Sequence, residues 1–339
     1  MLFSTPLSAD PTAPNYPPYR APWWLPGGHL QTLYPALFLR RRFAPFRRQR
    51  WELDDGDFVD VDWTMGDRDA PLVVLFHGLE GSARGHYAGS LMRQVVALGW
   101  RGAVVHFRGC SGEPNRLARA YHSGDSAEIE QLLRRFRADN DRLYAVGVSL
   151  GGNALLKWLG EHGADARRIV TASAAVSTPF DLMSAGRSLD RGLNRVLYTR
   201  HFLRTLKQKA REKLARFPGL ANPAALARVA TLHDFDQLYT APVHGYKDAD
   251  DYWRRASSKP WLSRIAVPTL VINACNDPFM PATALPTPAQ LSTQVTAEFS
   301  ATGGHAGFVS GSFPGHLDWL PARILAFFRA HGQGGENPS

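Results

Sequence analysis

The sequence lacks the segments that would send a chain into or across a membrane, and it holds only two cysteines among 339 residues. No run approaches the roughly 18 apolar residues that a membrane-spanning helix needs. The first residues carry neither the basic nor the apolar stretch of a secretory signal peptide. Cys110 and Cys275 lie too far apart in the sequence to suggest a disulfide framework. We therefore expect a cytoplasmic protein whose thiols are free.

Sequence signatures of metal and cofactor sites are also missing. The chain has no H-E-x-x-H helix, no C-x-x-C pair and no zinc-finger spacing, so no metal site is predicted. It has no phosphate-binding loop and no G-x-G-x-x-G between a strand and a helix. We expect no cofactor.

Lysine is scarce among the basic residues, of which there are 39 against 30 acidic ones, giving a net charge of +9. The excess is concentrated in two stretches, residues 40–50 and 187–216. Such clusters suit the anionic headgroups of a membrane or nucleic acid. Without an aromatic RNA-binding motif or a long basic tail, we expect no nucleic-acid partner. Two alternatives stay open for each cluster: peripheral contact with an anionic membrane, or arginines that are solvated or paired within the protein.

The length fits one large α/β domain with an insertion, and 44% of the residues are hydrophobic. Residues 1–50 are predicted to be an extended arm rich in proline and arginine, because seven prolines among residues 1–26 disfavour a regular helix or strand. From Trp51 to Trp63, apolar and polar residues alternate around Asp55-Gly56, which is typical of a β-hairpin.

Short apolar runs then alternate with segments of helical spacing, which predicts a mostly parallel sheet with helices on both faces. The predicted strands are 72–76, 102–107, 143–148, 168–173, 268–274 and 294–299, and the predicted helices include 87–98, 125–138 and 151–161. Asp125 and Glu128 have the spacing of a helix-capping box. The alternation stops within a basic, helix-rich stretch. We therefore predict a core at 51–177 and 259–332, an inserted helical cap at 178–258 and a disordered tail at 333–339.

Ser149 lies in Gly147-Val-Ser-Leu-Gly-Gly152, which matches the nucleophile elbow G-x-S-x-G. The motif follows a predicted strand and opens a predicted helix. A serine there sits on a sharp turn that exposes its hydroxyl, and only small neighbours permit such a turn. Ser149 is the predicted nucleophile.

A serine elbow needs backbone amides that stabilise an oxyanion. One comes from the residue after the nucleophile, here Leu150, and the other from a loop after an earlier strand. That loop is His77-Gly-Leu-Glu-Gly-Ser82, in which the Leu79 amide is the natural second donor. His77 is predicted to organise this loop through hydrogen bonds and not to act as a base.

The base and its acidic partner should follow the serine in the chain. His305 lies between glycines after the last predicted strand, and Asp277 follows the strand that ends near Ala274. The carboxyl edge of a parallel sheet is where such folds place their ligands. His316 is the alternative base. Asp234 and Asp236 compete with Asp277 but lie within the insertion.

With these residues, Ser149 would attack a carbonyl carbon, His305 would accept its proton, and Asp277 would orient the imidazole. An acyl-enzyme would form on Ser149. The prediction is therefore a serine hydrolase with a Ser-His-Asp triad.

Six motifs in order along the chain match one family: Gly28-His-Leu-Gln-Thr32, Asp54 to Trp63, His77 to Ser82, Arg108 to Glu113, Gly147 to Asn153 and Gly303 to Phe308. On these residues the sequence resembles the YheT-like family of α/β-hydrolases, which is related to plant embryogenesis-associated proteins and mammalian α/β-hydrolase-domain lipases. The similarity runs roughly from Trp24 to the last helix. It implies an α/β-hydrolase fold, hydrolysis of acyl or lipid-like carboxylic esters, and a triad of Ser149, Asp277 and His305.

Other functions stay open beside the esterase. An acyltransferase or thioesterase could use the same triad, although no histidine begins the H-x-x-x-x-D motif sometimes proposed for acyltransferase relatives. A protein of another class would bind an anionic surface or nucleic acid through its arginines without catalysis. For the hydrolase, the expected partner is a small-molecule ester or a lipid.

Overall fold

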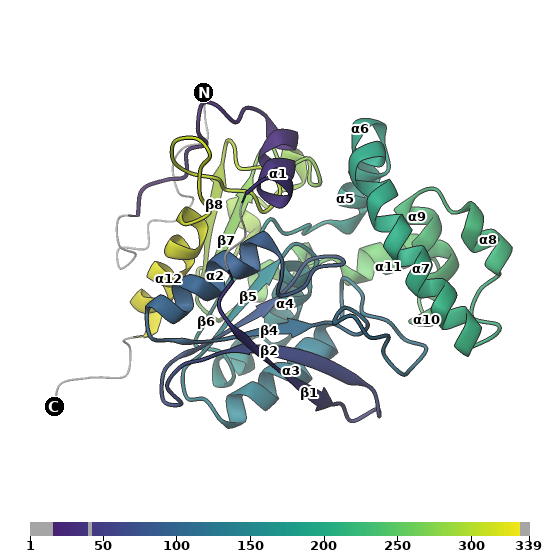
Figure 1. The fold of residues 1–339 in the computed structure, drawn as a ribbon, viewed down its shortest axis with the longest axis horizontal. Helices are drawn as coiled ribbons and strands as arrows, with labels where there is room; N and C mark the ends of the chain where they lie inside the picture. Colours follow the sequence, from purple (N-terminus) through teal and green to yellow (C-terminus); the bar gives the residue numbers. More distant parts are fainter. Residues whose placement is uncertain (1–15, 40–42, 333–339) are drawn as a thin grey trace.

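The computed structural model describes residues 16–39 and 43–332, and an eight-stranded sheet forms its centre (Figure 1). The strand order is β1-β2-β4-β3-β5-β6-β7-β8. The first two strands of this order run antiparallel to their neighbours, and all other pairs are parallel. The strands are β1 (Phe46–Glu52), β2 (Phe58–Thr64), β3 (Leu72–Phe76), β4 (Arg101–His106), β5 (Leu143–Val148), β6 (Ala172–Val176), β7 (Thr269–Ala274) and β8 (Val295–Ser300).

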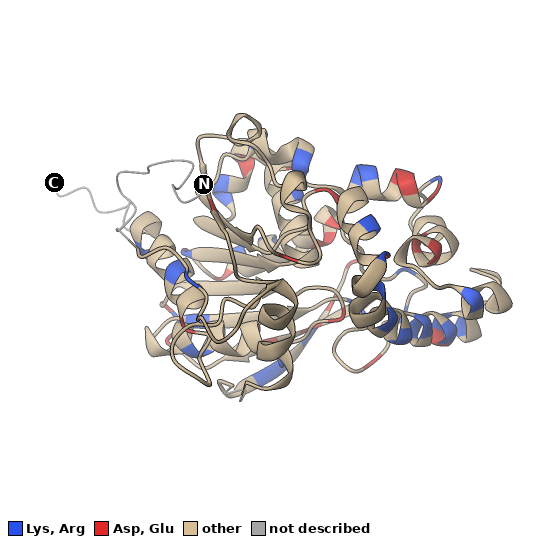
Figure 2. Cartoon of the chain, turned by 90° about the horizontal axis from the view of Figure 1, so that it is seen from above, with Lys and Arg blue, Asp and Glu red and all other residues tan. Residues whose placement is uncertain are grey.

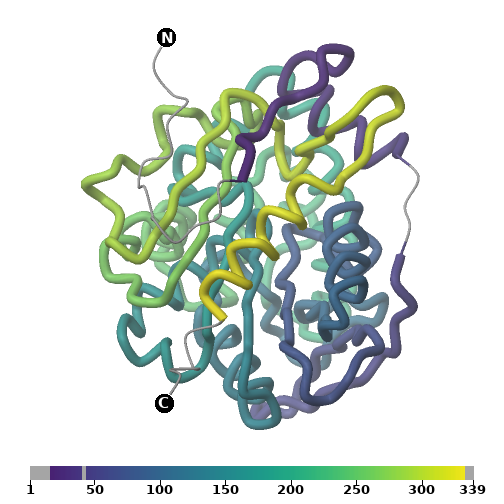
Figure 3. The backbone as a smooth tube through the Cα atoms, turned by 90° about the vertical axis from the view of Figure 1, so that its left-hand side faces the viewer, coloured from purple at the N-terminus to yellow at the C-terminus, as the bar shows by residue number. Residues whose placement is uncertain are grey.

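Helices cover both faces of this sheet. Successive residues of a strand point to opposite faces, so the apolar side chains of the central strands need helices on each face to bury them. Leu72, Val74 and Phe76 of β3 pack on the face covered by α3 (Ser126–Ala138) and α4 (Leu150–His162). The intervening Val73 and Leu75 pack on the other face, against α2 (His86–Ala97) and α12 (Trp319–Gly332). Figure 3 shows α12 crossing that face beside α2. The predicted architecture, a mostly parallel sheet between helices, is confirmed.

The N-terminal region corrects the prediction of an extended arm over residues 1–50. Helix α1 (Gly28–Leu37) forms within it, and β1 begins at Phe46, before the predicted start of the hairpin. The pattern hid β1 because its residues from Arg47 to Arg50 are all exposed. The strand is stabilised by its backbone pairing with β2 and not by burial of these side chains. Residues 1–15 of the predicted arm, Arg40 to Arg42 of the first basic cluster and the predicted tail at 333–339 lie outside the described residues.

Cross-strand ion pairs account for part of the first basic cluster. Arg48 pairs with Asp62 at 2.7 Å and Arg50 pairs with Asp60 at 2.9 Å, each across the β1–β2 ladder. These two arginines therefore stabilise the hairpin, which supports pairing within the protein over contact with a membrane for this stretch.

Two local predictions were wrong. The run at 168–173 was expected to be a strand, but β6 begins only at Ala172. Residues 163–168 form a 3₁₀ turn, and the Ile169 and Val170 amides both donate to Ala166 O, so the apolar pair closes a turn. Helix α3 begins where predicted, yet the Asp125 side chain does not cap it. That carboxylate pairs instead with Arg119.

Between β6 and β7 the chain builds a helical layer, at the right of Figure 1. We call residues 178–258 the cap. It has its own apolar cluster, to which α7 contributes Leu203, Ala210 and Leu214. No helix within the described ranges is long and apolar enough to cross a bilayer. The cap helices are α5 (Leu182–Leu189), α6 (Gly192–Asn194), α7 (Arg200–Arg216), α8 (Pro223–Arg228), α9 (Leu232–Phe235), α10 (Ala241–Val243) and α11 (Ala249–Ala256), with π-helical turns at Arg195–Thr199 and Asp236–Thr240.

Candidate active site

Ser149 occupies a sharp turn between the end of β5 and the start of α4. Its backbone has φ 54° and ψ −120°, a conformation that residues other than glycine rarely adopt. The neighbouring glycines make the turn sterically feasible. A Cβ atom on Gly147 would lie 2.5 Å from Gly151 O, and one on Gly151 would lie 2.4 Å from Phe76 O. The local geometry is that of the nucleophile elbow that the motif predicts.

The structure brings the three predicted triad side chains together from loops far apart in the sequence. His305 Nε2 lies 2.9 Å from Ser149 Oγ, and His305 Nδ1 lies 2.8 Å from Asp277 Oδ2. These are hydrogen-bond distances. One imidazole therefore connects the hydroxyl to the carboxylate.

Burial and a backbone hydrogen bond hold the Asp277 carboxylate in place. The Asp277 side chain is fully buried, and its Oδ1 accepts a hydrogen bond of 2.8 Å from the Phe279 amide. The Phe279 ring stacks on the His305 ring with centroids 3.9 Å apart. With one face covered and both ring nitrogens engaged, the imidazole has little freedom to turn.

The two predicted amide donors lie beside the serine. Leu150 is the first residue of α4, so its N–H has no acceptor within that helix. Leu79 follows Gly78, where a Cβ atom would lie 3.0 Å from Ser149 Cβ. Within the described part of the chain, neither amide donates to another residue. Both are therefore available to a ligand oxygen at Ser149.

His77 has the organising role that the sequence predicts. Its Nδ1 donates to Gly78 O at 2.7 Å, and its Nε2 accepts from the Phe107 amide at 3.2 Å. Burial lowers the pKa of His77 to about 3, so the ring stays neutral.

The alternative candidates lie in other contacts. His316 pairs with Asp318 at 3.2 Å. Asp234 closes a capping box with Thr231 at the start of α9. The Asp236 carboxylate accepts from Trp253 Nε1 within the cap. None of the three contacts Ser149 or His305 among the described residues.

Sequence reasoning missed the role of the motif at residues 28–32. Gln31, which is 1% exposed, accepts hydrogen bonds from Asn276 Nδ2 at 2.9 Å and from the Gly303 amide at 2.8 Å. Thr32 Oγ1 accepts from the His305 amide at 2.9 Å. Helix α1 thus braces both the aspartate loop and the histidine loop. Only the resemblance pointed to this motif, since the triad rules do not require it.

A cavity of about 1000 Å³ lies above the serine, between the core and the cap. Its floor includes Ser149, His305 and Leu79, and its lining is largely apolar on the cap side. This volume suits a ligand of drug or lipid-fragment size. The apolar lining includes Leu182, Ala185, Leu189, Phe235, Trp253 and Phe279.

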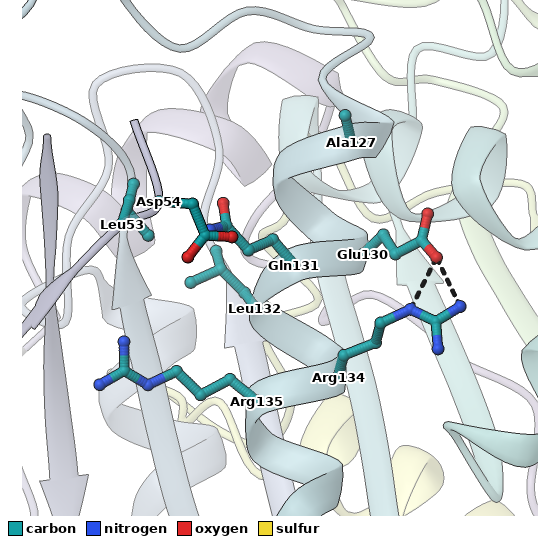
Figure 4. A pocket seen from close by; sticks show the side chains of 8 residues that line it. All are labelled: Leu53, Asp54, Ala127, Glu130, Gln131, Leu132, Arg134 and Arg135. Atoms are coloured by element: carbon teal, nitrogen blue, oxygen red, sulfur yellow. Dashed lines mark hydrogen bonds and ion pairs between the residues drawn. The ribbon is translucent and has the colours of Figure 1, made fainter. Parts of the chain in front are cut away.

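A second hollow, of about 480 Å³, lies on the outer side of α3 (Figure 4). Glu130 and Arg134 there pair with each other at 2.7 Å. Arg135 donates to Glu52 O and lies over the Trp51 ring. Glu130, Arg134 and Arg135 thus have structural partners, and the triad lies in the other cavity.

Comparison with known proteins agrees with this fold. The family described as "alpha/beta hydrolase fold" matches residues 71–312. This chain belongs to the α/β-hydrolase family. It is 45% identical over 304 residues to the "putative esterase YheT" of Escherichia coli K12, spanning 87% of this chain and 88% of that one. It is therefore a YheT-like member of the α/β-hydrolases.

The chain is also similar to more distant proteins. The chain is 25% identical over 318 residues to human "phospholipase ABHD3", spanning 91% of this chain and 77% of the relative. Among solved structures it is similar to a bacterial membrane phospholipase A, with a TM-score of 0.55 and 14% identity over 90% of each chain. The esterase EaEST of Exiguobacterium antarcticum superposes with a TM-score of 0.54 at 17% identity, covering 83% of this chain and 99% of that one. At such identities the structural likeness shows the fold alone.

Proposed function

We propose that this α/β-hydrolase cleaves carboxylic esters of acyl or lipid-like type, with Ser149, His305 and Asp277 as its catalytic triad. The hydrogen-bonded chain from Ser149 Oγ through His305 to buried Asp277, at the floor of a large apolar cavity, carries the proposal. Relatives named as esterase and phospholipase support the same chemistry.

In the proposed reaction, Ser149 Oγ attacks the ester carbonyl carbon while its proton passes to His305 Nε2. The carbonyl oxygen gains negative charge and accepts hydrogen bonds from the Leu79 and Leu150 amides. As the carbon–alkoxy bond breaks, His305 returns the proton to the departing alcohol. Water, deprotonated by His305, then attacks the acyl-enzyme and releases the acid and the free serine. Asp277 stabilises the imidazolium in both halves.

The acyl group is proposed to lie against the apolar side chains of the cap. Burying each methylene contributes about 0.8 kcal/mol, so a chain of several carbons gains substantial affinity there. We therefore expect esters of medium or longer acyl chains to be better substrates than acetate.

The first experiment combines fluorophosphonate labelling with hydrolysis of p-nitrophenyl acetate, butyrate, octanoate and palmitate. Wild type should label and hydrolyse with a chain-length optimum. Ser149→Ala should lose labelling and at least about 10⁴-fold in kcat, while Ser173→Ala, a buried serine of β6, serves as the control. A folded wild type that neither labels nor hydrolyses any ester would overturn the proposal. Added alcohol acceptors separate hydrolysis from acyl transfer, and thioesters test the thioesterase alternative.

We also propose that the cavity end of the molecule contacts an anionic membrane. Exposed apolar side chains gather near α1, where Trp23 is 91%, Phe38 73% and Phe313 74% exposed. Helix α6 lies at the same end (Figure 1), and Leu193 there is 57% exposed. Four arginines at this end form no ion pair within the described residues: Arg191 and Arg195, which flank α6, and Arg200 and Arg204 near the start of α7. Apolar and cationic side chains together fit an anionic bilayer.

Co-sedimentation with vesicles tests this contact. Wild type should bind vesicles containing phosphatidylglycerol and lose binding to pure phosphatidylcholine or in high salt. Replacing Trp23 and Phe38 by serine should weaken binding, whereas replacing the exposed Val96 and Leu98 of the α2 end should not. Equal binding by the two double variants would exclude this face.

A further inference from the structure

The loop that carries the proposed oxyanion donor contains an unusual turn. The Gly81 amide donates to Gly78 O at 2.9 Å, which closes a four-residue turn with Leu79 and Glu80 at its centre. Glu80 has φ 54°, at the position where such turns favour glycine or asparagine. A glutamate held there requires support from the rest of the structure. The conformation of this turn sets the direction of the Leu79 N–H.

The support for Glu80 begins with a buried tyrosine of the core. The Glu80 amide donates to Tyr121 Oη at 2.9 Å, and the same hydroxyl donates to Glu80 Oε1 at 2.7 Å. Burial raises the pKa of Tyr121 well above its usual value, so its phenol keeps the proton that it donates. Backbone and side chain of Glu80 are therefore tied to one group.

The second support comes from the cap. Lys209 of α7 places Nζ 2.8 Å from Glu80 Oε1 and 3.5 Å from Cys110 Sγ. The Glu80 side chain is 11% exposed and the Lys209 side chain 36%, so the carboxylate side of this ion pair is largely shielded from water. Lys209 thus connects a cap helix to the residue beside Leu79.

Helix α7 carries two more cations on the same side, and these dock on a different part of the core. Lys213 Nζ donates to Asn115 O at 2.7 Å, and Arg216 donates to Asn115 O at 2.9 Å and Arg116 O at 3.0 Å. Both side chains therefore hold the cap to the loop at Asn115 and Arg116, and neither contacts Glu80. Figure 2 shows this helix as a row of basic residues beside the core.

We propose that Lys209 is a positioning residue of the oxyanion hole: by pairing with Glu80 it holds the turn in which the Leu79 amide points at the substrate oxygen. This inference rests on the proposed function of Ser149 and Leu79. It means that seating of the cap completes the catalytic site, so a displaced cap leaves the nucleophile intact and the oxyanion hole misaligned.

The test compares Lys209→Met with Lys213→Met, two lysines one turn apart on α7. Lys209→Met should lower kcat roughly 10- to 100-fold with KM within about twofold, because part of one oxyanion hydrogen bond is lost. Binding of an acyl trifluoromethyl ketone, which places an oxyanion at the same position when Ser149 adds to it, should weaken in parallel. Lys213→Met should affect KM or thermal stability more than kcat. Lys209→Arg should restore most of the activity.

A second background separates positioning from general support. Glu80→Gly removes the side chain but suits the positive φ. In that background, Lys209→Met should have no further effect on kcat. Equal kcat losses in Lys209→Met and Lys213→Met, or an undiminished Lys209→Met loss in the Glu80→Gly background, would overturn the inference. Inactivity of the wild type itself would instead reject the proposed function.

Discussion

Beneath the cavity, Ser149, His305 and Asp277 sit on loops tied by buried hydrogen bonds, whereas the cap above offers mainly apolar side chains and a row of cations. In the core half, the Gln31 side chain joins two loops through hydrogen bonds of 2.8 and 2.9 Å. In the cap half, apolar side chains such as Leu182 and Leu189 pack against their neighbours without directional bonds. Orienting the reacting groups requires directional hydrogen bonds, whereas binding an acyl chain requires buried apolar surface.

The difference implies that substitutions in the two halves should fail in different ways. Core substitutions should lower kcat for every ester. Cap substitutions should change which ester is preferred, or the stability, and leave the chemistry nearly intact. Lys209 is the exception, since it extends from the cap and pairs with Glu80 in the loop that carries Leu79.

The largest expected contrast is between two carboxylates. Asp277→Asn should lower kcat on the order of 10⁴-fold, because the amide favours the wrong imidazole tautomer. Asp190→Asn is the matched change in the cap, where the carboxylate accepts from the Leu232 and His233 amides at 2.7 and 3.0 Å. It should lower the melting temperature and leave kcat within about threefold. Steady-state kinetics on p-nitrophenyl butyrate would measure both, and similar kcat losses would contradict the division.

A smaller effect is expected from the brace in α1. Gln31→Ala should lower kcat roughly 10- to 100-fold, since a displaced His305 loop misaligns the base by a fraction of an ångström. Gln237→Ala removes a cap glutamine whose Oε1 accepts from the Ala249 amide. Its kcat should match wild type. Thermal melts on both variants would show whether the loss in Gln31→Ala follows geometry or unfolding.

Substitution inside the cavity should change selectivity more than rate. Ala185 lies in α5 and lines the cap side of the cavity. Ala185→Phe should fill acyl space and lower kcat/KM for octanoate roughly tenfold relative to acetate, as lost methylene burial would require. Hydrolysis of a graded ester series gives this ratio. An unchanged ratio would place the acyl chain elsewhere.

The same division explains how far the sequence could be interpreted. The elbow, the glycine-flanked histidine and the aspartate after β7 are local signals, and the structure brings those residues together. The hairpin around Asp55-Gly56 was predicted, but residues 46–50 of its first strand were not, because exposed arginines carry no apolar alternation. The contacts of Gln31 and Lys209 escaped because each joins segments far apart in the chain, at separations of 245 and 129 residues. Single-sequence patterns do not report such pairings.

The smallest expected effect concerns a carboxylate of the cap. Burial raises the pKa of Asp236 to about 6, above its usual 3.8, with hydrogen bonds from Thr240 and Trp253 opposing the shift. The folded state therefore holds this proton more tightly than the unfolded state, and the resulting stability is present below pH 4 and lost as the pH rises through 6. Asp236→Asn stays neutral at every pH, so it should melt about 2 to 4 °C above wild type at pH 8 and close to it at pH 4.5. Thermal melts at the two pH values measure the difference. A variant equally or less stable than wild type at pH 8 would mean that the charged carboxylate is well accommodated. Burying Asp236 in the cap would then cost less free energy of folding than this structure indicates.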